Sequence, residues 1–135
     1  MRYLVKEEPE NYSYRQFAKD RGTTWSGVKN PLAQKYLRGI RKGDLVFYYH
    51  TDAEKAVVGI AKATGDAYPD PADAAGKAHV VDLVPVTPLT HPVTLAAVKA
   101  DRRFDTCPLT YLPRLSVMPV SDREWAAIME LSEAG

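Results

Sequence analysis

The longest apolar run in the chain, Leu45 to Tyr49, places the tightest limit on its fold. The run follows the turn sequence Lys42-Gly43-Asp44 and continues to His50, and its β-branched and aromatic residues are typical of a strand. It is far shorter than the roughly 20 apolar residues that a membrane-spanning helix needs. We therefore expect a globular domain that contains a sheet, with no membrane segment.

The rest of the chain supplies short helices and strands. Strand patterns cover residues 3–6, 57–64, 79–86 and 115–118, whereas residues 21–24 are expected to form a loop. Helix starts are marked by four capping residues, Ser13, Asn30, Thr94 and Ser121. This order predicts a single α+β domain over residues 1–135, a small curved sheet or barrel flanked by short helices.

Charge and cysteine content limit the class of protein. A length of 135 residues is one domain, and the single cysteine, Cys107, excludes an internal disulfide and fits a reducing cytoplasm. The chain begins with a strand-like segment and not with a signal leader, so a cytoplasmic location is expected. The net charge of +1 divides into +5 for residues 1–62 and −4 for residues 63–135. A basic half can face phosphates, although such asymmetry also occurs without function.

Catalytic and metal motifs are weak. Cys107 stands before Pro108 without an activating motif, the three histidines lack metal-ligand spacing, and no glycine-rich phosphate loop is present. We therefore expect a binding module and not an enzyme, with no catalytic residue, metal or cofactor.

The segment from Thr24 to Asn30 is the first candidate binding site. Trp25 is expected in a loop, Gly27 permits unusual backbone conformations, and Asn30 stands at a helix start with free amide groups. An indole beside amide groups suits a nucleobase that has left its stack. The alternative is a buried tryptophan that holds the helix against the sheet.

The aromatic strand is the second candidate. Because side chains alternate along a strand, Phe47 and Tyr49 share one face while Tyr48 and His50 share the other. Buried hydroxyl and imidazole groups need partners, so one pair is expected to line something other than plain core. Tyr68, in a Tyr-Pro-Asp-Pro connection, is a possible further aromatic wall, and Trp125 is expected in the core.

Taken together, these segments resemble the EVE domain, a branch of the PUA-like superfamily related to the YTH readers of methylated adenine. The resemblance is carried, in order along the chain, by Lys6-Glu7-Glu8-Pro9, Trp25-Ser26-Gly27-Val28-Lys29-Asn30, Gly43-Asp44-Leu45-Val46-Phe47-Tyr48-Tyr49-His50, Ala67-Tyr68-Pro69-Asp70-Pro71, Pro92-Val93-Thr94-Leu95 and Arg114-Leu115-Ser116-Val117-Met118-Pro119-Val120. Two positions depart from the family pattern. Glu7 replaces the usual Ser or Thr, and Lys29 replaces Arg.

The resemblance implies a PUA-like barrel and a non-enzymatic reader that binds a flipped 5-methyl- or 5-hydroxymethylcytosine base in DNA. It makes Trp25 a wall of the base pocket. The further residues expected to line or support that pocket are Lys6, Glu7, Ser26, Asn30, Tyr49, His50, Tyr68, Arg114 and Ser116. Phosphate contacts are expected from the basic residues around the second helix, Lys29, Lys35, Arg38, Arg41 and Lys42.

Three other functions stay open at this point. The chain could read a modified base in RNA. It could be a small enzyme acting on a modified nucleotide, with Glu7 and His50 as an acid–base pair. A protein-interaction module is the third alternative, and it predicts an exposed apolar patch.

Overall fold

The structure is a computed structural model that describes residues 1–135. Its strands are β1 (Arg2–Glu7), β2 (Thr23–Trp25), β3 (Leu45–His50), β4 (Ala56–Ala63), β5 (Tyr68–Pro69), β6 (His79–Thr94) and β7 (Val117–Val120). Its helices are α1 (Pro9–Tyr12), α2 (Tyr14–Asp20), α3 (Pro31–Arg38), α4 (Leu95–Lys99), α5 (Pro108–Tyr111) and α6 (Asp122–Ala134), with a 3-10 turn, η1, at Arg102–Phe104. None of these helices has the length and apolar content to cross a membrane.

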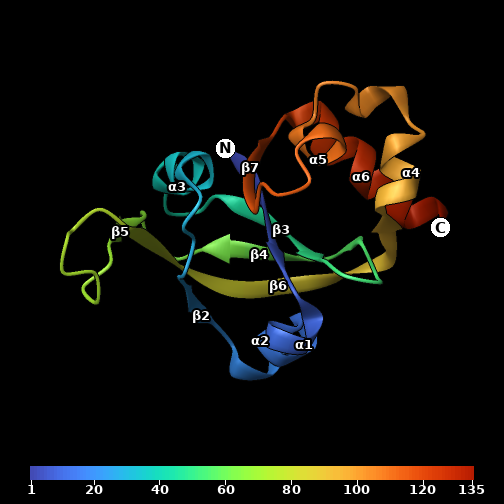
Figure 1. The fold of residues 1–135 in the computed structure, drawn as a ribbon. Helices are drawn as coiled ribbons and strands as arrows, with labels where there is room; N and C mark the ends of the chain where they lie inside the picture. The colour runs from blue at the N-terminus through green and yellow to red at the C-terminus, as the bar shows by residue number, and fades with distance from the viewer.

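One curved sheet organises the domain (Figure 1). Its strand order is β2-β6-β4-β3-β1-β7, with β5 paired to β6. Only β1 and β3 run parallel, as expected for strands separated by helices, and the other pairs are antiparallel. The long β6 shifts register twice against β4, and such irregularities bend a strand. The α+β prediction is confirmed. The curled sheet is a half-barrel and not a closed barrel, because its edge strands β2 and β7 do not pair with each other.

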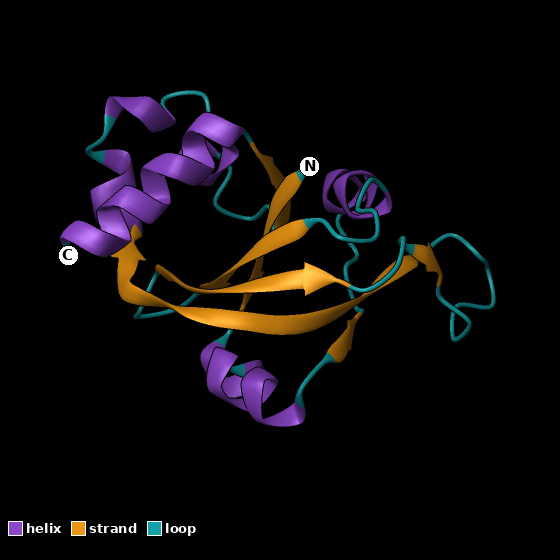
Figure 2. Cartoon of the chain, turned by 180° about the vertical axis from the view of Figure 1, so that it is seen from behind, coloured by secondary structure: helices purple, strands orange, loops and turns teal.

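Helices cover the two faces of the sheet (Figure 2). On one face, Tyr48 stacks on Phe17 of α2 with ring centroids 5.5 Å apart. On the other, Phe47 stacks on Trp125 of α6 with centroids 3.6 Å apart. The predicted alternation along this strand and the core position of Trp125 are therefore confirmed. The two faces are buried separately, so neighbouring residues of β1 and β3 enter different surroundings.

The predicted helix caps are confirmed. The hydroxyls of Ser13 and Thr94 each accept a backbone N–H bond, and the Asn30 side chain accepts the N–H of Ala33 at 3.0 Å. Ser121 and Glu124 form both bonds of a capping box.

Three local predictions were wrong. Trp25 ends a short strand and is not in a loop, because residues 23–25 complete the edge of the sheet beside β6. The strand predicted to end at residue 86 continues to Thr94, since its bends let it follow the curved sheet. The strand predicted for residues 115–118 is formed instead by Val117–Val120, which leaves Arg114 and Ser116 outside it.

Candidate functional site

A hollow beside Trp25 is the strongest candidate site, and we refer to it as the Trp25 hollow. Its volume is about 290 Å³, and it lies between the end of β1, the start of the first helix pair and β2. Seven residues line it: Glu7, Asn11, Tyr12, Thr23, Thr24, Trp25 and Ser26. All seven carry a hydroxyl, carboxamide, carboxylate or indole group besides their apolar atoms, so the walls are rich in hydrogen-bonding groups. Such a wall suits a small polar aromatic ligand.

Trp25 is fixed in place by the sheet and by the core. Its backbone pairs with Val81 of β6. Its indole meets the ring of Tyr48 edge to face, with centroids 5.3 Å apart and planes at 85°. Trp25 is only 6% exposed, so a ligand in the hollow can touch part of the indole and not a whole open face. The indole therefore serves both as core and as a wall of the hollow.

The chain after Trp25 is held by a buried side chain. The Gln34 amide on α3 donates to the carbonyl oxygen of Val28 at 2.7 Å and to that of His79 at 3.2 Å. The Gln34 carbonyl oxygen accepts the backbone N–H of His79 at 3.0 Å. Because buried amides need partners, this arrangement ties the segment between β2 and α3 to the start of β6.

Below Trp25, the Tyr48 hydroxyl donates to the backbone carbonyl of Tyr12, a residue on the wall of the hollow. Burial raises the pKa of Tyr48, and the negative charge of Glu7 raises it further. Tyr48 therefore stays neutral at any physiological pH and keeps the Tyr12 backbone in place.

Glu7 brings the only carboxylate to the Trp25 hollow. It is the last residue of β1, and one carboxylate oxygen accepts the backbone N–H of Glu8 at 2.9 Å. This bond orients the carboxylate and leaves the second oxygen without a partner in the protein. A ligand of this hollow must therefore accept a neighbouring negative charge or donate to it.

His50 lies next to this site but does not line it. The Nε2 atom accepts the backbone N–H of Tyr14 at 3.0 Å, and Nδ1 lies 2.5 Å from a carboxylate oxygen of Glu54. Both ring nitrogens are therefore used, and the side chain is buried. His50 supports the turn into α2, and no free nitrogen is left for an acid–base pair with Glu7.

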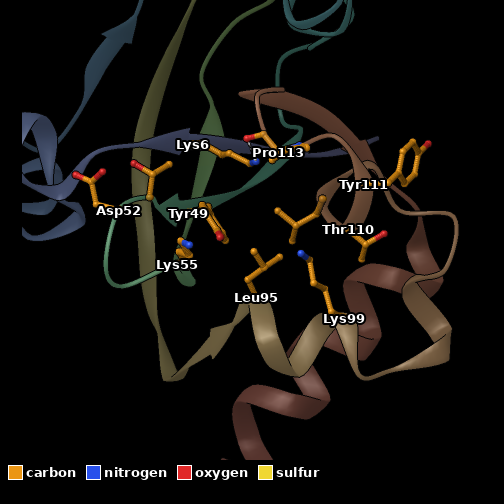
Figure 3. Close-up of a pocket in the computed structure, with 11 residues that line it drawn as sticks. Lys6, Tyr49, Asp52, Lys55, Leu95, Lys99, Thr110, Tyr111 and Pro113 are labelled. Atoms are coloured by element: carbon orange, nitrogen blue, oxygen red, sulfur yellow. Dashed lines mark hydrogen bonds between the residues drawn. The ribbon is translucent and has the colours of Figure 1, made fainter.

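Lys6 and Tyr49 point away from the Trp25 hollow. Lys6 precedes Glu7 on β1, and Tyr49 follows Tyr48 on β3. Because Glu7 and Tyr48 face Trp25 and side chains alternate along a strand, Lys6 and Tyr49 face the opposite side of the sheet. There the Lys6 ammonium lies 5.4 Å from the centre of the Tyr49 ring and donates to the Pro113 carbonyl at 3.2 Å. Lys6 and Tyr49 therefore do not line the Trp25 hollow, and a supporting role for them in base binding stays a prediction. They line a separate hollow (Figure 3).

Asn30 and Arg114 meet in a third hollow of about 280 Å³, with Leu32, Leu112, Pro113 and Leu115. Asn30 has its carboxamide oxygen bound in the helix cap, so its amide N–H groups remain as donors. Ser116 is half-buried, and its backbone carbonyl accepts the N–H of Lys6. None of these three residues lines the Trp25 hollow.

Tyr68 is exposed on β5 and does not line the Trp25 hollow. Its hydroxyl donates to the Asp82 carboxylate at 2.9 Å, and the Thr24 hydroxyl donates to the same oxygen at 2.8 Å. Tyr68 is therefore linked to the wall residue Thr24 through the Asp82 carboxylate.

Three wall residues were missed by the sequence analysis: Asn11, Tyr12 and Thr23. Thr23 lies two residues before Trp25, so a strand assignment for residues 23–25 could have found it. Asn11 and Tyr12 belong to the short helix α1, and no spacing in the sequence links that helix to Trp25.

The predicted phosphate-binding residues differ in whether their charged groups are already bound within the protein. Lys29, Lys35, Arg38 and Lys42 are exposed and form no ion pair. Arg41 is different, because its guanidinium donates to the carbonyls of Arg38 at 2.7 Å and Ile40 at 3.1 Å. Arg41 therefore binds the carbonyl of the last residue of α3, and the four other side chains are the free cations of this region.

Comparison with known families gives a match to the EVE domain model over residues 1–131. The chain belongs to the EVE domain family. Among solved structures, the Rpa0253 protein of Rhodopseudomonas palustris shares 42% sequence identity over 98% of this chain and 93% of that chain, with a TM-score of 0.93. The Zymomonas mobilis ASCH protein shares 13% identity at a TM-score of 0.60, which supports the fold alone.

Human THYN1 protein, solved in complex with DNA that contains 5-methylcytosine, shares 25% identity with a TM-score of 0.83 over 98% of this EVE chain and 97% of that chain. Thymocyte nuclear protein 1 of Gallus gallus is 36% identical over 80 residues, which are 50% of this chain and 33% of that protein. The matched stretch is thus about a third of the relative's length. That relative is named as a nuclear protein, and the cytoplasmic location expected from the single cysteine stays a prediction.

Proposed function

We propose that this EVE domain binds DNA that carries a modified cytosine and takes that base into the Trp25 hollow. The observation that carries the proposal is the hollow itself, where Trp25, Ser26 and Glu7 meet on one wall surface. A flipped base needs an apolar surface to stack on and polar groups that read its edge. The human relative bound to 5-methylcytosine DNA supports DNA as the nucleic acid and cytosine as the base.

The roles within the hollow follow from chemistry. Trp25 forms the apolar wall, and Ser26 and the neighbouring hydroxyls bind the polar edge of the base. Glu7 accepts a hydrogen bond from the exocyclic amino group at position 4 of cytosine, a pairing that carboxylates make with this base. The free cations around α3 bind backbone phosphates without reading sequence.

The test is a binding comparison of short oligonucleotides that differ in one base. Cytosine, 5-methylcytosine and 5-hydroxymethylcytosine are placed in the same DNA and RNA sequences, and affinity is measured by fluorescence anisotropy. We expect tighter binding of the modified DNA, by about 10- to 200-fold per methyl group in a fitted pocket. Equal affinity for modified and unmodified strands would contradict the proposal, and a preference confined to RNA would transfer it to RNA.

Glu7 makes a specific prediction about the base. Thymine carries the same methyl group as 5-methylcytosine but presents an oxygen acceptor at position 4 in place of an amino group. The wild-type carboxylate repels that oxygen, whereas the amide of Glu7→Gln can donate to it. We expect Glu7→Gln to reduce the preference for 5-methylcytosine over unpaired thymine by about 1–3 kcal/mol. Glu8→Gln, one residue further along, is the matched control, and an equal change there would remove Glu7 from base reading.

Lys29 makes a prediction about the phosphates. Lys29→Gln removes one phosphate contact. We expect it to weaken the binding of modified and unmodified DNA alike and to lower the slope of log affinity against log salt concentration by about one. The measurement is a salt titration of each oligonucleotide. A change in base preference without a change in slope would instead place Lys29 at the base.

A further inference from the structure

A second hollow lies on the opposite face of β1 and β3 from Trp25, and base binding makes no use of it. Its volume is about 300 Å³, and we refer to it as the lysine hollow. The residues that line it are Lys6, Tyr49, Thr51, Asp52, Lys55, Leu95, Lys99, Leu109, Thr110, Tyr111 and Pro113. Figure 3 shows Tyr49 and Lys99 directed into the space between β3 and α4. The walls thus come from five parts of the chain, β1, the end of β3, the turn before β4, α4 and the α5 region.

The lysine hollow carries an excess of positive charge. Lys6, Lys55 and Lys99 are its cations, and Asp52 is its one carboxylate. None of the three lysines forms an ion pair within the protein. Three uncompensated ammonium groups around one small volume repel one another, and an anion placed among them would relieve that repulsion.

Lys6 is the cation that most needs such a partner. It is half-buried in β1, its one hydrogen bond is to the Pro113 carbonyl at 3.2 Å, and it lies over the Tyr49 ring. A buried ammonium has three N–H donors, so two of them lack an acceptor. Burial also lowers the pKa of Lys6, as expected for a cation that has lost water without gaining a counter-charge.

The remaining walls supply neutral donors and an apolar surface. The side chain of Tyr49 is only 3% exposed and lines the hollow. The Thr51 hydroxyl is buried and has no hydrogen-bond partner in the protein. Leu95 and Leu109 supply apolar contacts beside these polar groups. The hollow therefore offers positive and polar groups beside apolar contacts.

We propose that the lysine hollow is a second binding site, which takes a small phosphate monoester with an apolar or aromatic body. A phosphate monoester carries about −1.5 to −2 charges and three strong acceptor oxygens, which match three ammonium groups opposed by one carboxylate. A volume of about 300 Å³ is at the small end of small-molecule pockets, which favours one compact ligand. The site lies on the opposite face of β1 and β3 from Trp25, so it shares no lining residue with the Trp25 hollow.

The test uses phenyl phosphate as the probe, followed by two-dimensional NMR of the full chain. We expect saturable shifts of residues around the hollow, with tighter binding than inorganic phosphate because of the apolar wall and no binding of uncharged benzyl alcohol. We expect Lys55→Gln and Lys99→Gln each to lower the affinity for phenyl phosphate about tenfold or more, which is the effect of losing one charge-assisted hydrogen bond. Lys62→Gln is the matched control, since Lys62 is exposed on β4 and lies outside the hollow.

A variant that gains affinity tests the site independently of stability, because a general loss of folding cannot tighten binding. Asp52 has a φ of 64°, a conformation that asparagine tolerates, so Asp52→Asn keeps the turn while it removes the opposing charge. We expect this variant to bind phenyl phosphate several-fold more tightly than the wild type. Unchanged affinity in Asp52→Asn would show that the anion does not bind near Asp52, and an equal loss in Lys62→Gln would show that phenyl phosphate responds only to overall surface charge. Either result would overturn the proposal.

Two further outcomes separate this site from the Trp25 hollow. Lys55→Gln is expected to keep the preference for 5-methylcytosine DNA, and Trp25→Leu is expected to keep phenyl phosphate binding. If unmodified DNA displaces phenyl phosphate from the lysine hollow, the site belongs to the nucleic-acid backbone and the small-ligand proposal is wrong. A failure of base reading alone leaves phenyl phosphate binding intact, so the two proposals fail separately.

Discussion

Replacing Trp25 with alanine is expected to abolish the preference for modified DNA and to lower the free energy of unfolding by about 3–5 kcal/mol. The loss of binding follows because stacking on an aromatic side chain contributes about 1–3 kcal/mol per base. The loss of stability follows because the indole is 6% exposed and packs edge to face on Tyr48. Affinity is measured with the oligonucleotide set above, and stability by urea unfolding.

A destabilised variant needs a folded comparison. Small domains are stable by about 5–15 kcal/mol, so Trp25→Ala comes near the limit of folding. Trp25→Leu keeps much of the buried apolar volume and removes the aromatic wall, so we expect it to stay folded and still to lose the preference. A folded Trp25→Leu protein that discriminates 5-methylcytosine as well as the wild type would refute the role of Trp25 in the hollow.

Replacing Trp125 with alanine is expected to cost a similar 3–5 kcal/mol of stability but to leave base recognition unchanged. The two tryptophans are equally buried, each 6% exposed, yet Trp125 stacks on Phe47 and carries the Arg2 guanidinium over its ring at 5.3 Å. It lines none of the hollows described above. Comparing the two variants therefore separates loss of stability from loss of the site.

Fluorescence gives a direct measurement in the Trp125→Ala protein, because Trp25 is then the only tryptophan. A base that enters the Trp25 hollow is expected to change the emission of that indole, in proportion to the binding seen by anisotropy. In the Trp25→Ala protein, the emission of Trp125 reports unfolding, and we expect it not to change when the oligonucleotide is added. An emission change on DNA binding in Trp25→Ala would place the nucleic acid near α6 and away from the proposed hollow.

Several elements follow from local chemistry and were predictable. Ser13, Asn30, Thr94 and Ser121 cap helices because their side chains accept N–H groups that the first helical turn leaves free. The apolar run of β3 forms a strand for the equally local reason that its β-branched and aromatic residues suit a pleated surface. The EVE resemblance, carried by motifs in order along the chain, was confirmed by the family match over residues 1–131.

The composition of the candidate site was predicted only in part. Trp25, Ser26 and Glu7 do meet in one hollow, whereas Lys6, Tyr49 and His50 do not join them there. A motif states which residues lie close in sequence, but in a strand adjacent residues point to opposite faces. Lys6 and Glu7 on β1 accordingly line different hollows, and Tyr49 and His50 on β3 face opposite sides of the sheet.

The sequence by itself determined the capped helices, the strand at the centre of the sheet and membership of the EVE family, because these depend on short-range preferences and on motif order. Only the tertiary structure decided which motif residues share a hollow. The curvature of β6 brings Thr24 and Trp25 to the end of β1, and the two covered faces of the sheet send Lys6 and Tyr49 to a separate positive hollow. Those contacts join residues far apart in the chain, and sequence spacing carries no information about the direction from which they meet.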